Sequence, residues 1–384
     1  MIKAIVNLGL IVIPFIIING FGTREPKLYA GLLFSLILGL LSFWYGLYKP
    51  LKNYWINILI VFFVISYFLA PKPDLKLFSD QVGMFWFWKS FLFILIYYLG
   101  FNAIQSIYFT KQDKNYLFNI ISYVGLVMAL YCLLQGLRIE QFYSISGLNN
   151  TVIIKGTLGS LGIVASFLAM IVPIVLYMRK FLFAIVMVIA IILTHSLVAI
   201  IALIVSLLFY LSTFGKKQFI TACLLFLAMA VPILVFTYKD VKNHKFNADG
   251  YRFSVWKETV KETKNMPFTG LGLGTFNYTY YLKHHIPGED YRQAHNDYIE
   301  LMYNSGIIGL SLFLLSIYWL YKQTYKIKLI FNKTINRENM ALLSSFTSIA
   351  ICAGGLFIWQ LGAHIYYTLI IAGLLHNNIR GGVV

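Results

Sequence analysis

Long apolar segments, separated by mostly short polar connections, follow one another along almost the whole chain. We expect twelve of them, at residues 4–20, 28–48, 54–70, 88–109, 116–136, 157–178, 181–194, 197–214, 219–237, 298–321, 341–357 and 359–376. A helix that crosses a bilayer needs roughly 20 apolar residues, and most of these segments approach that length. The pattern predicts an all-α, polytopic integral membrane protein with about 12 transmembrane helices, folded as a single membrane domain over residues 1–384.

The composition agrees with this fold class. Hydrophobic residues make up 59% of the chain and charged residues only 12%, whereas charged residues are about 25% of an average soluble protein. The net charge of +17 is explained by membrane orientation, so we expect no nucleic-acid partner. Cys132, Cys223 and Cys352 lie in apolar segments at no metal-ligand spacing, which predicts packing roles instead of disulfides or zinc.

Lys and Arg are divided unevenly between the two sides of the predicted topology. If the N-terminus is cytoplasmic, the cytoplasmic side holds Lys3, Lys49, Lys52, Lys111, Lys114, Arg179, Lys180, Lys216, Lys217, Lys322, Lys326, Lys328, Lys333, Arg337 and Arg380. The short outer connections hold only Arg24, Lys27, Lys72, Lys76, Lys89, Arg138 and Lys155. Because cytoplasmic loops carry the excess of basic residues, we expect both termini in the cytoplasm.

The apolar run 181–211 is too long for one untilted span and short for two. Basic pairs at 179–180 and 216–217 flank it, so both of its ends are expected on the cytoplasmic side. The run is therefore predicted to be a helical hairpin that turns at residues 194–196, at or just below the outer membrane surface. His195 in this turn either caps a helix or contacts a ligand in the outer half of the membrane.

One long hydrophilic stretch, residues 238–297, interrupts the apolar pattern between the ninth and tenth spans. It falls on the outer side, and loops of this length in a compact protein are usually functional. Within it, residues 251–264 predict an amphipathic helix with Arg252, Trp256 and Val260 on one face. Such a helix is expected to lie in the membrane interface.

Glycines and histidines follow this helix. Gly270, Gly272 and Gly274 are spaced unlike a dinucleotide fingerprint and predict a backbone that turns tightly or approaches a ligand closely. His284 and His285 are expected to be solvated, since two adjacent histidines seldom point at one metal ion. His295 differs, because it stands with Asn296 at the start of the helix that enters the membrane.

Several of these motifs, in this order, resemble the O-antigen ligase and polymerase superfamily. The signature His-Asn, nine residues, Gly, two residues, Gly is found at 295–309. Arg-x-x-x-Trp at 252–256 and Pro-x-x-Gly-x-Gly-x-Gly-x-Phe at 267–276 precede it in the outer loop. Upstream, "KGTLGS" at 155–160 and "LTHSLVA" at 193–199 resemble two further family segments. The resemblance covers residues 155–310 in detail and the whole chain in topology.

The resemblance implies a GT-C-like glycosyltransferase in the bacterial inner membrane. Such enzymes transfer a glycan from undecaprenyl diphosphate to an acceptor hydroxyl on the outer side, with neither metal nor cofactor. Arginine suits the diphosphate, because its planar guanidinium makes bidentate contacts to phosphate oxygens. Histidine suits deprotonation of the hydroxyl, because its pKa lies near working pH. We therefore assign catalytic roles to Arg252 and His295.

Other substrate contacts are expected at Arg292, Asn296, Trp256, Gly272, Gly274, His195 and Lys155. The chain also departs from the family pattern at two places. Ser160-Leu161-Gly162 stands where the family has Asn-Pro-Asn, and Leu197 stands where it has an arginine that meets the diphosphate. His195, if protonated, or Lys155 is the candidate replacement for that phosphate contact.

Two activities of the superfamily share these motifs. A ligase moves the glycan onto lipid A-core, and a polymerase moves a growing chain onto another carrier-linked repeat. One sizeable outer loop favours the ligase. A secondary transporter is the alternative from another class, but transporters concentrate ionisable residues and broken helices near the membrane midplane, whereas the polar residues here gather in one outer loop.

Overall fold

The computed structural model describes residues 1–17, 24–47, 54–69, 80–139, 154–214, 220, 248–276, 279–280, 293–331 and 337–381. The regular structure of these residues is entirely helical, which confirms the all-α prediction. The helices are α1 (Ile2–Phe15), α2 (Glu25–Trp44), α3 (Tyr54–Leu69), α4 (Asp80–Ser106), α5 (Lys111–Gly136), α6 (Leu161–Tyr177), α7 (Phe181–Leu193), α8 (Leu197–Leu211), η1 (Ser212–Phe214), α10 (Ala248–Thr263), α12 (Asp297–Phe331), α13 (Arg337–Ala353), η2 (Ile358–Gln360) and α14 (Gly362–Gly381). Every predicted apolar segment except 219–237 contains a helix; apart from residue 220, that segment lies outside the described residues.

The helices have the surface of a membrane protein. In the described part of the chain, α2, α5, α12 and the pair α8–η1 contain stretches long and apolar enough to cross a bilayer, and α1, α3, α6 and α7 are shorter apolar helices. Large apolar side chains are exposed on the outer helices, among them Leu33, Leu40, Val61, Phe68, Leu182 and Ile185. Exposed apolar surface on this scale is stable against lipid and not against water.

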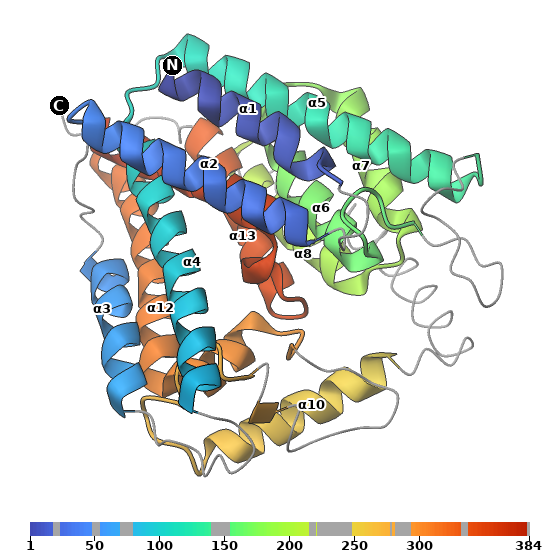
Figure 1. Ribbon diagram of the computed structural model, residues 1–384. Helices are drawn as coiled ribbons and strands as arrows, with labels where there is room; N and C mark the ends of the chain where they lie inside the picture. Colours follow the sequence, from blue (N-terminus) through green and yellow to red (C-terminus); the bar gives the residue numbers. More distant parts are fainter. Residues whose placement is uncertain are drawn as a thin grey trace.

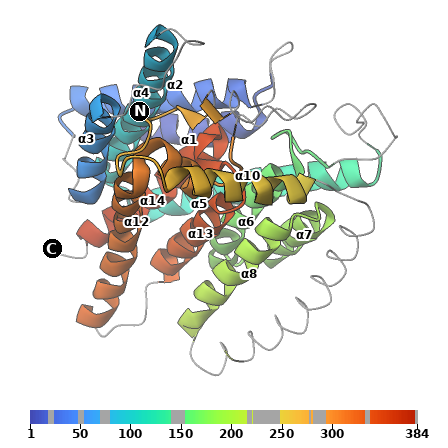
Figure 2. The same cartoon turned by 90° about the horizontal axis from the view of Figure 1, so that it is seen from below.

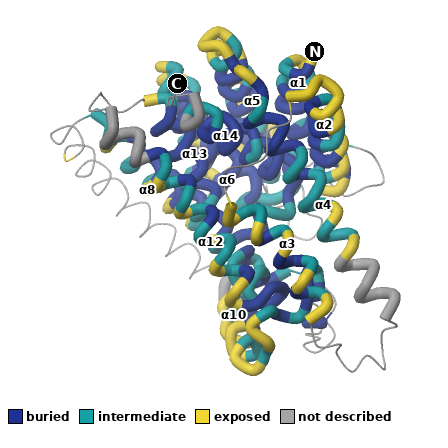
Figure 3. The backbone as a smooth tube through the Cα atoms, turned by 90° about the vertical axis from the view of Figure 1, so that its left-hand side faces the viewer, coloured by how far each residue is buried: buried dark blue, intermediate teal, exposed yellow. Residues whose placement is uncertain are grey.

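Helix α6 forms the centre of the packed helices. It contacts α5, α7, α8 and α13, and its residues from Ile163 to Val175 are buried. In the tube coloured by burial, the segments around α6, α13 and α14 are dark, and exposed residues gather on the periphery (Figure 3). Buried Cys132 and Cys352 are free thiols in this core, as packing roles require, while Cys223 lies outside the described residues.

The molecule has two chemically different ends. Both termini lie at one end, which we call the terminal end, and α10 lies across the opposite end, which we call the α10 end (Figure 1). Figure 2 views the molecule from the α10 end. At the terminal end Lys3 Nζ donates to Asp113 at 2.6 Å, and Lys114 Nζ donates to Glu338 at 3.0 Å. Residues that the charge pattern assigns to the cytoplasm therefore meet at one end of the protein.

The apolar run 181–211 forms two helices, while its predicted membrane orientation stays a prediction. Helix α7 ends at Leu193 and α8 begins at Leu197, so the turn lies at the predicted residues 194–196. Thr194 and Ser196 hold the cap positions, and His195 is the left-handed residue between them, with φ of 53°. The 13 residues of α7 span about 20 Å, less than the roughly 30 Å hydrocarbon core, so the turn lies short of a full crossing.

Candidate functional site

The membrane helix α12 is broken near its start. Gly306 has φ 66° and ψ −174°, which are not helical values. The break leaves the carbonyls of Tyr303 and Asn304 without their usual helical N–H donors. The glycine-rich segment, residues 268–276, supplies two backbone N–H groups in their place. Leu271 N donates to Tyr303 O at 3.2 Å and Gly272 N donates to Asn304 O at 2.8 Å. On the far side of the break, Ile308 N donates to Phe268 O at 3.3 Å.

The glycines are needed because two backbones touch at this break. A Cβ at Gly306 would lie 2.0 Å from Phe268 O, and a Cβ at Gly270 would lie 2.4 Å from Gly306 N. Both residues also have positive φ, which favours glycine. The close approach expected from the glycine spacing is therefore made to the backbone of α12. Asn304 Oδ1 completes the junction by accepting from Phe276 N at 2.9 Å.

Helix α12 begins directly after His295. Asn296 Oδ1 accepts from Tyr298 N and Ile299 N, both at 3.1 Å, and so caps the helix. Asn296 Nδ2 donates to Gly354 O at 2.8 Å, which ties the cap to the segment after α13. His295 itself has a left-handed φ of 51°. An uncommon conformation for a non-glycine residue, locked between fixed neighbours, is typical of functional sites.

Residue 294 is held from both sides. Trp256 Nε1 of α10 donates to Ala294 O at 2.7 Å, and Ala294 N donates to Glu300 Oε2 at 3.0 Å. Helix α10 was predicted to present Arg252, Trp256 and Val260 together. Its buried residues are instead Val255 and Thr259, while Val260 is 38% exposed. The inward face is thus rotated toward position 255, because Val255 packs in the cluster around Tyr303.

The segment after α13 places the aromatic ring of Phe357 against His295. Glu300 Oε1 accepts from Gln360 Nε2 at 2.8 Å, and Asp297 Oδ2 accepts from Trp359 N at 3.0 Å. These two carboxylates of α12 hold residues 357–360 against the helix start. As a result the ring of Phe357 packs edge-on against the imidazole of His295, with centroids 4.9 Å apart.

Two cations surround His295. Burial, followed by the positive charges of Arg252 and Arg24, lowers the pKa of His295 to about 4. The imidazole is therefore neutral near pH 7 and able to accept a proton. Its Nδ1 is buried without a hydrogen-bond partner among the described residues. A substrate hydroxyl that donates to this nitrogen would remove the cost of leaving it unsatisfied.

Comparison with known proteins identifies this arrangement. The O-antigen ligase family model matches residues 182–314, from α7 through α10, the glycine segment and His295 to the residues just past the break. Residues 182–314 therefore match an O-antigen ligase domain, which supports the O-antigen ligase superfamily for this chain. No curated protein matches it.

Two neighbours of His295 lie outside the matched O-antigen ligase domain. Arg24, immediately before α2, stacks on the Phe357 ring with its guanidinium carbon 4.7 Å from the centroid. Sequence reasoning counted Arg24 only as an outer-loop charge and gave Phe357 no role beyond an apolar segment. Neither residue stands in a motif, so only the fold brings them together. Glu300, which holds residue 294, was likewise not singled out.

The structure also describes the surroundings of His195 and Lys155. Val198, next to the His195 turn, packs so closely on Gly355 that a Cβ at Gly355 would lie 2.6 Å from it; the turn therefore adjoins the segment that carries Phe357. Lys155 donates its backbone N–H to Gln135 Oε1 at 3.1 Å, and the neighbouring Thr157 donates to Pro14 O at 2.6 Å, near the end of α1. Arg292, His284 and His285 lie outside the described residues.

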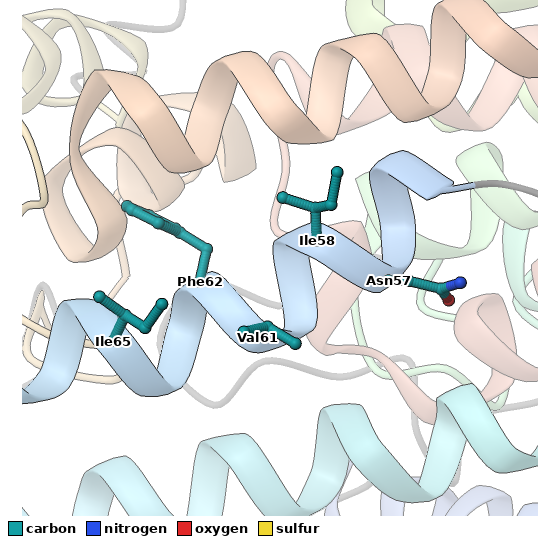
Figure 4. Close-up of a pocket in the computed structure, with 5 residues that line it drawn as sticks. All are labelled: Asn57, Ile58, Val61, Phe62 and Ile65. Carbon is teal, nitrogen blue, oxygen red and sulfur yellow. The ribbon is translucent and has the colours of Figure 1, made fainter.

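An apolar depression on α3 lies apart from this site (Figure 4). Asn57, Ile58, Val61, Phe62 and Ile65 line it, all from one helix. No predicted site residue lines this depression, and four of the five side chains that do are apolar. These five side chains include no acid, base or cation, so this depression adds no candidate for the chemistry.

Proposed function

We propose that this chain is a membrane glycosyltransferase that moves a glycan from undecaprenyl diphosphate to an acceptor hydroxyl. The observation that carries the proposal is a neutral, half-buried histidine at the α10 end, with two arginines beside it. A lipid diphosphate is the anion that needs such cations, and a sugar hydroxyl is the nucleophile that needs such a base. The outer side of the bacterial inner membrane, with both termini cytoplasmic, remains the predicted location.

The reaction balances with the residues present. The acceptor hydroxyl oxygen attacks the anomeric carbon of the glycan while His295 takes the hydroxyl proton. The bond from that carbon to the phosphate oxygen breaks, and undecaprenyl diphosphate leaves with the electron pair. Arg252, with its guanidinium fork, stabilises the charge that grows on the diphosphate. The proton on His295 is then released to solvent.

Several predicted contacts act by holding this machinery in place. Trp256 ties α10 to the residue before His295, and Asn296 uses both its polar groups to fix the start of α12. Gly272 and Gly274 shape the segment that docks into the helix break. Direct substrate contacts of Arg292, His195 and Lys155 stay predictions.

The proposal includes catalysis without a metal ion. Asp297 and Glu300, the acids nearest to His295 in the described sequence, already accept hydrogen bonds from Trp359 N and Ala294 N. Among the described residues, no group of three or more His, Cys, Asp or Glu has the arrangement of a metal site. We propose that arginine stabilises the leaving group.

The test is glycan transfer by the purified protein in lipid nanodiscs, with an undecaprenyl-diphosphate-linked glycan and lipid A-core as substrates. We expect transfer that survives EDTA and that Arg252→Lys largely abolishes, because lysine keeps the charge but loses the bidentate fork. Activity that chelator removes and magnesium restores would contradict the metal-free mechanism. Wild-type activity in Arg252→Lys would contradict the diphosphate role.

The acceptor is resolved by the glycans of a deletion strain. We propose a ligase, for which long chains disappear from lipid A-core and carrier-linked polymer accumulates. A polymerase would instead leave chains of one repeat on the core. Unchanged glycans together with a lost solute uptake would overturn transferase activity in favour of transport.

A further inference from the structure

Among the described basic residues of the short outer connections, Arg24 is the one whose charge acts on His295. It precedes α2, more than two hundred residues before Arg252 in the chain, yet its charge reaches His295. Its guanidinium stacks on one aromatic ring, Phe357, and that same ring contacts the imidazole. Arg24, Phe357 and His295 therefore form a continuous row that sequence motifs do not connect.

The guanidinium of Arg24 is available to an anion. A guanidinium that stacks on a ring with its face keeps its N–H donors pointing outward in the plane. Arg24 is solvent-exposed, and in the described parts of the chain no carboxylate forms an ion pair with it. The positive charge is thus anchored by a ring and not neutralised by an acid.

We propose that Arg24 is a second diphosphate-binding residue, which supplies the phosphate contact that Leu197 cannot make. This inference rests on the proposed glycan transfer and names a residue that completes it. Arg24 approaches His295 beside Phe357, and Arg252 approaches it from α10. The diphosphate of the glycan donor lies between the two guanidinium groups, with the anomeric carbon toward His295.

Charge counting supports two arginines. The diphosphate of a lipid-linked glycan carries two negative charges, one on each phosphate, and gains a third as it leaves. Two guanidinium groups balance the bound diphosphate and remain to stabilise the developing charge. In the free protein these cations oppose protonation of His295, and a bound anion offsets them. Binding of the glycan donor therefore makes His295 a stronger base when a base is needed.

The experiment measures binding of undecaprenyl diphosphate to the full-length protein in nanodiscs, alongside glycan transfer. We expect Arg24→Ala to weaken undecaprenyl diphosphate binding by about 10–100-fold, the usual worth of a hydrogen bond to a charged group. Binding of undecaprenyl monophosphate, which has one phosphate fewer, is expected to change less. Arg24→Lys should restore part of the affinity, since lysine keeps the charge without the fork.

Arg138→Ala is the matched control. Arg138 is an exposed arginine predicted on the same side, and it is not among the charges that act on His295. We expect the control to bind and transfer like wild type. Unchanged affinity in Arg24→Ala, with a lower turnover or a shifted pH profile, would overturn the inference, because Arg24 would then act only through Phe357 and His295.

The two proposals fail in different ways. If Arg24→Ala binds undecaprenyl diphosphate and transfers glycan like wild type while Arg252→Lys does not transfer, Arg24 has no phosphate role and the transferase stands. If the wild-type protein transfers no glycan but binds undecaprenyl diphosphate through Arg24, the phosphate site stands and the transferase falls.

Discussion

The two ends of the molecule use basic residues in opposite ways. At the terminal end, Lys3 pairs with Asp113, and Lys114 pairs with Glu338. At the α10 end, Arg24 and Arg252 both act on one neutral imidazole. Paired charges offset each other and add a little stability. Like charges gathered around a half-buried histidine oppose its protonation, and the proposed diphosphate would offset them.

The largest effect should follow from removing the imidazole at the α10 end. His295→Ala deletes the proposed base, and a general base typically contributes about 10²–10⁴-fold to a rate. We expect transfer to fall by that factor while the amount of folded protein in the membrane stays normal. Quantified transfer at matched protein abundance checks this. Normal transfer at normal abundance would remove His295 from the mechanism.

The next effect concerns the break that carries the site. Gly306→Ala places a methyl group on Phe268 O, which adds an overlap cost of about 1–3 kcal/mol to the roughly 1 kcal/mol of a positive φ. We expect a lower melting temperature in detergent and loss of transfer, because the glycine segment must leave α12. Limited proteolysis of the 238–297 loop reports that release.

Gly46→Ala is the control for this prediction. Gly46 lies just after the C-terminal end of α2. Gly46 also has positive φ, 62°, but a Cβ there meets nothing within 4 Å. It should cost only the roughly 1 kcal/mol of the backbone conformation and leave transfer intact. Equal losses of melting temperature and of transfer in the two variants would show that the backbone contact at Gly306 is unimportant.

A smaller effect is expected in the pH dependence. A base works when deprotonated, and the pKa of His295 is lowered to about 4 by burial, Arg252 and Arg24. The kcat/KM of transfer, which reports the free enzyme, should therefore stay flat from neutral pH down to about pH 5 and fall below it. In Arg24→Gln the fall should begin at higher pH, since one opposing charge is gone. If the kcat/KM of the wild-type protein fell near the ordinary pKa of histidine, this electrostatic account would be contradicted.

The smallest effect on transfer belongs to the terminal end. Lys114→Met removes a cation that donates to Glu338 at 3.0 Å and also to Asn378, leaving a largely buried carboxylate less well satisfied. We expect a stability loss of about 1–3 kcal/mol, seen as a lower melting temperature. Transfer per folded molecule should equal wild type. A loss of transfer without a loss of stability would mean that the two ends are coupled.

Much of the fold was predictable, because the lengths of the apolar segments indicate the helices and the basic residues that flank them indicate where the chain turns. Helices α7 and α8 meet at the predicted turn, residues 194–196. The break at Gly306 was not predicted, although both glycine motifs were visible. A spacing of glycines indicates a close approach but not its partner, and here the partner is a helix that begins more than twenty residues later.

The site was predictable only where one loop supplies it. His295, Arg252 and Trp256 belong to one stretch with a recognisable order, so sequence reasoning could group them, and their roles stay predictions. Arg24 and Phe357 come from opposite ends of the chain and carry no motif. Their meeting depends on how α2 packs on α14, where Gly362 touches the backbone of Lys27 so closely that a Cβ would lie 2.1 Å from Lys27 O.

The order of synthesis gives the Phe357 contact a further meaning. Arg24 emerges early, His295 much later, and Phe357 only after α13 has been made. The glycine segment precedes α12 in the chain, so the break at Gly306 can form as that helix is inserted. The imidazole still lacks its ring, and Asn296 its partner at Gly354. A chain that stops at residue 331 therefore holds the histidine but lacks both Phe357 and Gly354, and we expect such a chain to be inactive.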